Sequence, residues 1–296
     1  MHTLVIGLGS MGYGAAISCL RAGITTSGVD LNPAAREAFA KDGGAAFPSV
    51  SEVTGVDCVL VFVINADQAE QVLFESGLFP NLTSDAVIIN CVTLAPSRAE
   101  SIAKRIGDAG FAYLDAPVSG GAAKARDGRM SIMASGDPNH FKRVQPVLDA
   151  ISEKVFRLGD TPGAGSQMKL INQLLAGVHI AAAAEALTLA AGLKMDLHEV
   201  IDVISHCAGS SWMFENRGPH IADGDYTPLS NVNIFVKDLG IVTEEAGRTG
   251  IVTPLSDTAL SLYREAAESG LGGEDDSAVA KLLARRSGIV LPGESA

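Results

Sequence analysis

The sequence predicts an α/β protein with two domains: a doubly wound parallel sheet over residues 1–162, then an all-helical domain over residues 163–296 that begins with a long interdomain helix. Three observations predict this fold class. A chain of 296 residues that is 47% hydrophobic can bury two cores. Short apolar runs alternate with helical segments up to about residue 160, as in parallel sheets buried on both faces. Residues 166–191 contain no proline, which favours one helix of about 26 residues.

The first predicted strand, over residues 2–6, leads into a glycine pattern and then into a helical segment, 13–22. Strand, glycine turn and helix follow in the order that a dinucleotide-binding fingerprint of the Rossmann type requires. The first glycine permits a sharp turn, the second lets a pyrophosphate approach backbone N–H groups, and the third lets helix and strand pack closely. The predicted cofactor contacts in this pattern are Gly7, Leu8, Gly9, Ser10, Met11 and Gly12.

The second predicted strand, 25–29, ends at Asp30. A carboxylate there can accept both ribose hydroxyls of NAD and would repel the 2′-phosphate of NADP, so the sequence favours NAD. We expect Asp30 and the adjacent Leu31 to contact the cofactor. The alternative for Asp30 is a cap on the helix that begins near Pro33.

Strand and helix signals continue to alternate along the first half. Strands are predicted at 57–64, 86–91, 111–114, 130–135 and 155–158, and helices at 67–74, 97–107 and 140–151. Thr93 comes just after one of these strands, at the carboxyl end where open α/β sheets bind ligands.

Another strand runs into the motif Asp115-Ala116-Pro117-Val118-Ser119-Gly120-Gly121. Its Ser119, Gly120 and Gly121 offer a hydroxyl and exposed backbone N–H groups, which suit a substrate carboxylate or the hydroxyls beside it. Read alone, the same three residues are equally well a simple turn.

The long predicted helix begins just after Gly163-Ala164-Gly165 and contains Lys169, Asn172 and Gln173. Residues three and four apart share one helix face, so an ammonium group and two carboxamides lie together and can hold a polar substrate. For an average helical lysine, the alternative of a solvated surface residue is the more common one. Further helices are predicted at 198–205, 211–216, 236–249, 254–269 and 277–286.

Lys237 and Asp238 place a cation beside an anion at the start of one of these later helices. On composition alone, an exposed ion pair is the default interpretation. None of the six histidines has the spacing of a metal ligand, so no metal is expected.

Charge and composition exclude several classes of protein. The formal net charge of −12, with no basic patch, argues against nucleic-acid binding. The four cysteines form no Cys-x-x-Cys pair, as expected for reduced thiols in the cytoplasm. The apolar segment 174–193 is long enough to cross a membrane, but it carries His179 and Glu185, so we expect a buried helix that also makes subunit contacts in a homodimer or homotetramer.

Four motifs, in order, resemble the β-hydroxyacid dehydrogenases, the family of 3-hydroxyisobutyrate dehydrogenase, tartronate semialdehyde reductase and, more distantly, 6-phosphogluconate dehydrogenase. They are the glycine pattern from Gly7, the motif from Asp115, Gly163-Ala164-Gly165 leading to Lys169, and Lys237-Asp238-Leu239. The resemblance covers nearly the whole chain. The runs at 92–96 and 169–180 are most similar to the branch that acts on L-threonate.

The resemblance implies a role for each site residue. Lys169 corresponds to the catalytic lysine, Ser119 to Gly121 to the loop that binds the substrate carboxylate, and Thr93 and Lys237 to cofactor contacts. We expect Asn172, Gln173 and Asp238 to bind substrate as well. The family usually has asparagine four residues after the lysine, whereas Gln173 stands there in this chain, so its substrate pocket should differ from that of 3-hydroxyisobutyrate dehydrogenase.

The implied reaction is oxidation of the 2-hydroxyl of L-threonate to 2-oxo-tetronate by NAD, with Lys169 as general acid and base. An ordinary lysine is charged at neutral pH, so burial and a second nearby cation such as Lys237 would be needed to favour the neutral amine. Three alternatives stay open: the same chemistry on 3-hydroxyisobutyrate or tartronate semialdehyde, an imine reductase, and a non-catalytic NAD-binding sensor. The sequence leaves open the stereochemistry of the substrate, the direction of the reaction, and any use of NADP.

Overall fold

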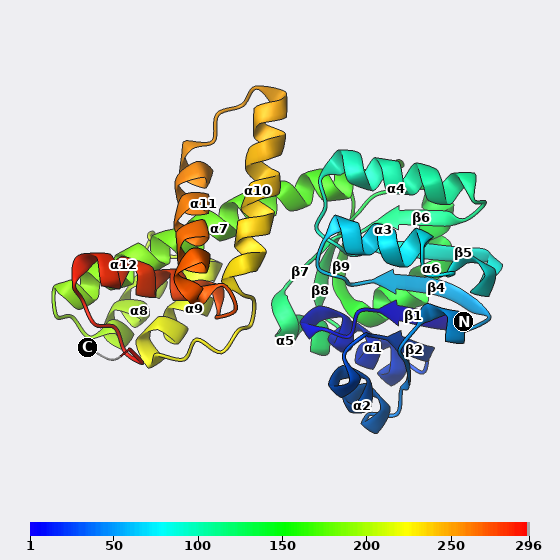
Figure 1. Cartoon of the computed structure of the whole chain (residues 1–296), viewed down its shortest axis with the longest axis horizontal. Coiled ribbons are helices and arrows are strands. Elements are labelled where there is room, and N and C mark those ends of the chain that lie inside the picture. Colours follow the sequence, from blue (N-terminus) through cyan, green and yellow to red (C-terminus); the bar gives the residue numbers. More distant parts are fainter. Residues whose placement is uncertain (295–296) are drawn as a thin grey trace. The chain divides into compact units, whose positions relative to one another are not determined.

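The computed structural model describes residues 1–294 of the chain. They form two compact units, one from Met1 to Lys169 and one from Leu170 onward. The boundary predicted between residues 162 and 163 stays a prediction, and the last two residues of the predicted second domain lie outside the described residues. Figure 1 shows the strands gathered in the first unit and helices alone in the second.

A parallel sheet of six strands, in the order β3-β2-β1-β4-β5-β6, forms the centre of the first unit. This is the strand order of dinucleotide-binding sheets. All six strands are parallel, and the order in which they are added to the sheet reverses between β1 and β4. The strands are β1 (His2–Ile6), β2 (Thr25–Val29), β3 (Ala45–Phe47), β4 (Val56–Val61), β5 (Leu82–Asn90) and β6 (Ala112–Asp115). The fold class predicted for this half is therefore confirmed.

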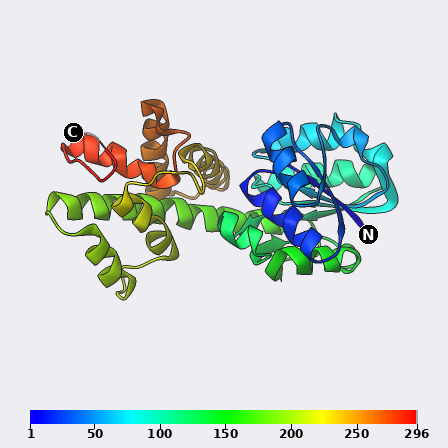
Figure 2. The same cartoon turned by 90° about the horizontal axis from the view of Figure 1, so that it is seen from below.

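Helices cover both faces of this sheet, as Figure 2 shows. Alternate residues of one strand enter opposite cores: Val59 and Val61 of β4 pack into one hydrophobic cluster, while Cys58 and Leu60 pack into the other. Both faces are thus apolar, which is why the strands appear in the sequence as continuous apolar runs. The helices of this unit are α1 (Ser10–Arg21), α2 (Pro33–Lys41), α3 (Ala66–Phe74), α4 (Pro96–Asp108), α5 (Gly121–Arg126) and α6 (Pro138–Ile151).

A second, smaller sheet lies beside the edge strand β6. It consists of β7 (Val118–Ser119), β8 (Met130–Ala134) and β9 (Ser152–Arg157), with β7 antiparallel and β9 parallel to β8. An isolated bridge pairs Asp115 at the end of β6 with Ser135 just after β8. The motif that begins at Asp115 therefore links the two sheets.

The second unit has its own helical core. Tyr263, one of its largest fully buried side chains, donates a hydrogen bond of 3.1 Å to the carbonyl oxygen of Gly177. The helices are α7 (Ala164–Gly192), which begins in the first unit, α8 (Leu197–Ser205), α9 (Trp212–Asp223), α10 (Val232–Thr249), α11 (Pro254–Ala266) and α12 (Val279–Ser287). Up to residue 294, this unit contains no strand, as the sequence predicts.

Helix α7 is long and apolar enough to cross a membrane by length and composition, and 44% of its most apolar window is buried within the protein. The core helix of a soluble protein can have the same length and composition, and the sequence predicts such a buried helix here.

Three elements were not predicted from the sequence: the strand β3, the two-residue strand β7 and the helix α5. The short strand β3 was not expected, because three residues at the edge of a sheet make no recognisable apolar run. No helix was predicted between residues 121 and 126, where the structure has the short helix α5. Short helical turns also occur at Val50–Glu52, Phe79–Asn81, Ala267–Leu271 and Asp276–Ala278.

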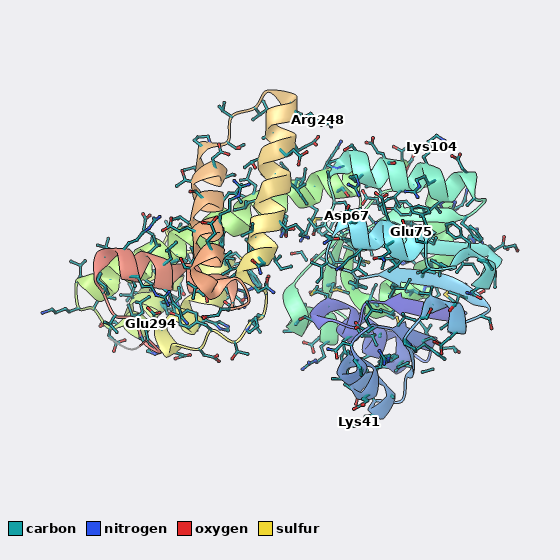
Figure 3. The ribbon with its side chains drawn as sticks, viewed as in Figure 1. Lys41, Asp67, Glu75, Lys104, Arg248 and Glu294 are labelled. Carbon is teal, nitrogen blue, oxygen red and sulfur yellow. The ribbon has the colours of Figure 1, made fainter. Side chains whose placement is uncertain are left out.

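The charged side chains are mostly on the surface, as Figure 3 shows for Lys41, Asp67, Glu75 and Lys104 of the first unit. Many form ion pairs with a neighbour; Lys104, for example, lies 2.6 Å from Asp108 one helical turn away. Such exposed pairs contribute little to stability. The few charged groups that are buried are therefore the ones that call for an explanation.

Candidate functional site

The glycine loop after β1 has the shape that close approach to a phosphate requires. Gly7 has φ +93°, and a Cβ on it would lie 2.7 Å from the carbonyl oxygen of Phe62. A Cβ on Gly12 would overlap the carbonyl oxygen of Gly7, so α1 can lie this close to the loop only with glycine there. A Cβ on Gly9, in contrast, would meet nothing within 4 Å.

Asp30 fastens this loop from the end of β2. Its carboxylate accepts 2.7 Å hydrogen bonds from the backbone nitrogens of Leu8 and Asn32. Each carboxylate oxygen can accept a further hydrogen bond, so the group can still bind two ribose hydroxyls. The next residue, Leu31, is 88% exposed. The cap on α2 is provided by Asn32 and not by Asp30, so the alternative role considered for Asp30 is wrong.

Arg36 lies closer to this position than its place in the sequence indicates. Its guanidinium donates to the backbone carbonyl oxygens of Asp30, at 2.7 Å, and Leu31, at 3.0 Å. The Arg36 cation therefore lies beside Asp30, the residue whose carboxylate favours NAD over NADP.

Thr93 lies half-buried after the carboxyl end of β5. The turn before it is held by Asn90, which is fully buried. The carboxamide of Asn90 donates to the hydroxyl of Tyr113, at 3.0 Å, and accepts from the backbone nitrogen of Val92, at 3.2 Å. The backbone leading to Thr93 is thus fixed by side-chain contacts with the neighbouring strand.

Ser119, Gly120 and Gly121 form the junction between β7 and α5. Gly120 has φ +130° and Gly121 has φ +70°, conformations in which other residues are strained. Ser119 and Gly120 are half-buried, and Gly121 is exposed. The segment is a turn, but one whose backbone is set by two glycines next to a hydroxyl.

Lys169 is not a solvated surface lysine. Only 7% of it is exposed, and its Nζ donates a 2.8 Å hydrogen bond to the carbonyl oxygen of Val118. Because Val118 immediately precedes Ser119, the ammonium group lies next to the predicted carboxylate-binding turn. The structure thus brings these two parts of the predicted site together within the first unit.

The predicted residues of the second unit form a separate polar cluster. The Nε2 of Gln173 donates to Oδ2 of Asp238, and the Nδ2 of Asn172 donates to Oε1 of Gln173 at 2.8 Å. The Nζ of Lys237 lies 2.9 Å from Oδ1 of Asp238. Asp238 is only 2% exposed, so the exposed ion pair expected by default for Lys237 and Asp238 is wrong.

Two family models match the chain and together cover most of it. The NAD-binding domain of 6-phosphogluconate dehydrogenase matches residues 3–159. A model described as the NAD-binding domain of NADP-dependent 3-hydroxyisobutyrate dehydrogenase matches residues 163–283.

Individual relatives match over almost their whole length. An L-threonate dehydrogenase of Escherichia coli O6:H1 is 50% identical, with 99% of this chain and 97% of the relative covered. An L-threonate dehydrogenase of Haemophilus influenzae is 48% identical, again with 99% and 97% covered. The chain belongs to the β-hydroxyacid dehydrogenase family. The crystal structure of a 3-hydroxyisobutyrate dehydrogenase from Salmonella typhimurium shares this fold with a TM-score of 0.91, at 50% identity, covering 95% of this chain and 99% of that one.

As a member of this family, the chain is an NAD-binding oxidoreductase, and the predicted cofactor class is confirmed. The glycine loop fits the cofactor on its own geometry. The open space beside Gly9 leaves room for a pyrophosphate at the start of α1, where Gly9 provides no side-chain cap for the first N–H groups of the helix. Asp30 would hold the ribose next to that loop.

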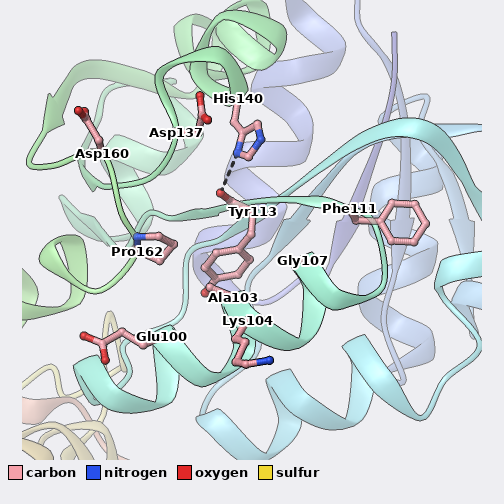
Figure 4. A pocket seen from close by; sticks show the side chains of 10 residues that line it. All are labelled: Glu100, Ala103, Lys104, Gly107, Phe111, Tyr113, Asp137, His140, Asp160 and Pro162. Atoms are coloured by element: carbon pink, nitrogen blue, oxygen red, sulfur yellow. Dashed lines mark hydrogen bonds between the residues drawn. The ribbon is translucent and has the colours of Figure 1, made fainter.

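A cavity of about 380 Å³ lies elsewhere on the first unit, between α4, β6 and the start of α6. Figure 4 shows Tyr113, Phe111 and His140 in its lining, with Glu100, Asp137 and Asp160 around them. None of the predicted site residues of the β-hydroxyacid dehydrogenase lines it. The cavity therefore does not coincide with the predicted site, which is located by its glycine loop, Asp30 and Lys169.

One buried group near the site was not assigned from the sequence. Asp115 is fully buried and accepts hydrogen bonds from Gly163 and Ser166 at the start of α7. Its position in the motif before Ser119 was noticed, but its partners are about 50 residues away in the sequence. One feature of the sequence could have indicated this role: Asp115 is a carboxylate at the end of an apolar strand, and a buried carboxylate needs hydrogen-bond partners. Up to residue 294, there is no cluster of His, Cys, Asp and Glu that could hold a metal ion.

Proposed function

We propose that this protein is an NAD-dependent dehydrogenase that oxidises the 2-hydroxyl of L-threonate to give 2-oxo-tetronate. The substrate is supported by two L-threonate dehydrogenases that are 48% and 50% identical over almost their whole length. The chemistry is supported by one observation above the others: the ammonium group of Lys169 is buried on the carbonyl oxygen of Val118, next to Ser119.

Lys169 acts as the general base of the oxidation. Its neutral amine takes the proton of the 2-hydroxyl while the same carbon loses a hydride, and in the reverse direction its ammonium group returns the proton to the forming alkoxide. NAD, when bound, supplies the hydride acceptor. Because Lys169 is shielded from water, proton exchange with solvent does not compete with transfer to the substrate.

The turn at Ser119, Gly120 and Gly121 binds the carboxylate. In L-threonate the 2-hydroxyl is on the carbon next to the carboxylate, so a carboxylate on this turn places that hydroxyl near the Lys169 ammonium group. Asn172 and Gln173 bind the hydroxyls further along the substrate, and Asp238 contributes by orienting the carboxamide of Gln173. Gly7 to Gly12, Asp30, Leu31, Thr93 and Lys237 contact the cofactor.

The protein further acts as a cytoplasmic homodimer or homotetramer. Support for subunit contacts comes from the exposed apolar residues of α7 in the second unit, which include Ile171, Leu175 and Leu189. The two-domain boundary between residues 162 and 163 is part of the same proposal; it lies at the end of one family-model match and the start of the next.

The experiment is a substrate panel. The absorbance of the reduced cofactor is followed with purified protein, NAD and, separately, L-threonate, D-threonate, 3-hydroxyisobutyrate and glycerate. We expect turnover with L-threonate at a kcat/KM at least tenfold above the other acids. Turnover only with another acid would refute the substrate, and NAD binding without turnover on any acid would favour the sensor.

The second candidate is a 3-hydroxyisobutyrate dehydrogenase. The observation in its favour is the solved structure bearing that name, which is 50% identical to this chain. The polar cluster of Asn172, Gln173 and Asp238 argues for a substrate with more hydroxyl groups than 3-hydroxyisobutyrate has. The same panel separates the two.

A further inference from the structure

One buried charge of the first unit has no role in the proposed chemistry, the carboxylate of Asp115 at the end of β6. Its Oδ2 accepts hydrogen bonds from the backbone nitrogens of Gly163, at 3.0 Å, and Ser166, at 2.8 Å. Its Oδ1 accepts a 2.7 Å hydrogen bond from the hydroxyl of Ser166, and the hydroxyl of Ser135 lies 3.4 Å from Oδ2. Asp115, Ser135 and Ser166 are all fully buried.

Two glycines allow the chain to approach the carboxylate this closely. A Cβ on Gly165 would lie 2.5 Å from the carbonyl oxygen of Met133 and 2.7 Å from that of Asp115. Gly163 has φ +113°, which turns its N–H group toward Asp115. The start of α7 is therefore built around this carboxylate.

Burying this group has an energetic cost. Burial raises the pKa of Asp115, and the hydrogen bonds from Ser166, Gly163 and Ser135 lower it and so offset part of the increase. A carboxylate at the N-terminus of a long helix also interacts favourably with the helix dipole. An apolar residue at position 115 would avoid the cost of removing a charge from water. The set of hydrogen bonds that only a carboxylate accepts therefore points to a role of Asp115 other than stability.

The contacts of Asp115 and Lys169 connect the same two segments. Asp115 is three residues before Val118, and Ser166 is three residues before Lys169. Asp115 binds Ser166, and Lys169 binds the carbonyl oxygen of Val118. The segment that holds the carboxylate-binding turn and the segment that holds the lysine are thus joined at two points.

We infer that Asp115 is the positioning residue of Lys169: its carboxylate fixes the first turn of α7 on the end of β6, so that the amine of Lys169 stays beside Ser119. This inference rests on the proposed role of Lys169. Asp115 does not touch the substrate in this arrangement. It acts through Ser166 and the helix backbone.

Asp115→Asn tests the inference with little change of shape. The carboxamide oxygen can accept the two backbone N–H groups, but its NH2 group cannot accept the hydrogen bond that the Ser166 hydroxyl donates to Oδ1. We expect kcat to fall by about 10-fold to 100-fold, as displacements of a catalytic group by about 1 Å do, while the Kd for NAD changes less than twofold. The KM for L-threonate should change less than about twofold, because Asp115 touches neither the substrate nor the cofactor.

Ser166→Ala is the second variant, and it decides the matter if Asp115→Asn does not fold. It removes only the hydroxyl contact, and we expect kcat to fall about threefold to tenfold with an unchanged Kd for NAD. Asp137→Asn is the matched control, because Asp137 caps α6 in the same unit by accepting from the backbone nitrogen of Asn139. It should leave kcat and the KM for L-threonate unchanged.

The results separate this inference from the proposed function. Wild-type kcat in Asp115→Asn and Ser166→Ala, together with an inactive Lys169→Ala, would overturn the positioning role and leave the proposed function intact. A fall in kcat equal to that of Asp137→Asn would also overturn it. An active Lys169→Ala would refute the role of the lysine itself, whatever the other variants do.

Discussion

Lys169 differs from an ordinary helical lysine because its ammonium group is bonded to a backbone carbonyl oxygen and nearly excluded from water. For Lys169→Ala we expect kcat to fall by about 10² to 10⁴-fold, the range that a general acid or base contributes. The Kd for NAD, measured by fluorescence titration, should change less than twofold. Lys104→Ala, on the exposed face of α4, is the matched control and should keep the wild-type rate. A Lys169→Ala variant with wild-type kcat would exclude the assigned role.

Asp30 and Arg36 place opposite charges at the end of β2, and we expect the two together to set the choice of cofactor. For Asp30→Ser we expect kcat/KM with NAD to fall by about tenfold or more, since charge-assisted hydrogen bonds to the ribose are lost. We expect kcat/KM with NADP to rise, because the repelling carboxylate is gone and Arg36 can approach a 2′-phosphate. Asp42→Ser, at the far end of α2, should leave the ratio of the two values unchanged. An Asp30→Ser variant that keeps the wild-type ratio would contradict this account.

The sequence predicts those site residues whose role depends on neighbouring residues in the chain. A strand followed by a glycine pattern needs only six neighbouring residues to be recognised, and Gly7 and Gly12 are indeed held where a side chain would overlap the backbone. The partners of Asp115 and Gln173 lie about 50 and 65 residues away in the sequence. No spacing rule links them, so these contacts had to come from the structure.

At the scale of the element, the first turn of α7 depends on the absence of a side chain at Gly165. Gly165→Ala would place a Cβ 2.5 Å from the carbonyl oxygen of Met133. We expect it to reduce the free energy of unfolding by about 1–3 kcal/mol, as overpacking does. The comparison is Gly240→Ala inside α10, where a Cβ would meet nothing within 4 Å; it should raise the free energy of unfolding by about 0.5–1 kcal/mol. Urea unfolding of both variants measures the difference, and equal values would contradict the packing argument.

Elements are predictable from the sequence when they are long or apolar. Helix α7 and the buried strands β4 and β5 carry their pattern over six residues or more. The strand β3 has three residues, and it is a strand because the neighbouring β2 offers a free edge with which it pairs. Helix α5 begins at two glycines with positive φ, Gly120 just before it and Gly121 as its first residue, and two such glycines in a sequence indicate a turn and not a helix.

At the scale of the whole molecule, stability should depend on pH through a buried cluster in the second unit. The guanidinium of Arg217 donates to Asp276 through Nε, at 2.6 Å, and Nη2, at 3.2 Å, and lies 3.7 Å from Asp275. Both carboxylates are fully buried, so the cluster carries one excess negative charge when both are ionised. Burial is the largest influence on Asp276 and raises its pKa to about 6.

A carboxyl group whose pKa is raised by folding stabilises the protein below its unfolded pKa, and this contribution is lost as the pH rises through the folded pKa. For Asp276 the loss falls between about pH 4 and pH 6 and amounts to at most about 3 kcal/mol. We therefore expect Asp276→Asn, which keeps a neutral group at this position, to lose less stability than wild type between about pH 4.5 and 7, measured by urea unfolding. Asp225→Asn, an exposed change in the same unit, should keep the wild-type pH dependence, because the pKa of Asp225 is lowered and it stays ionised throughout this range. If the stability of wild type and of Asp276→Asn depends on pH in the same way, Asp276 does not take up a proton in this pH range, and the account is wrong.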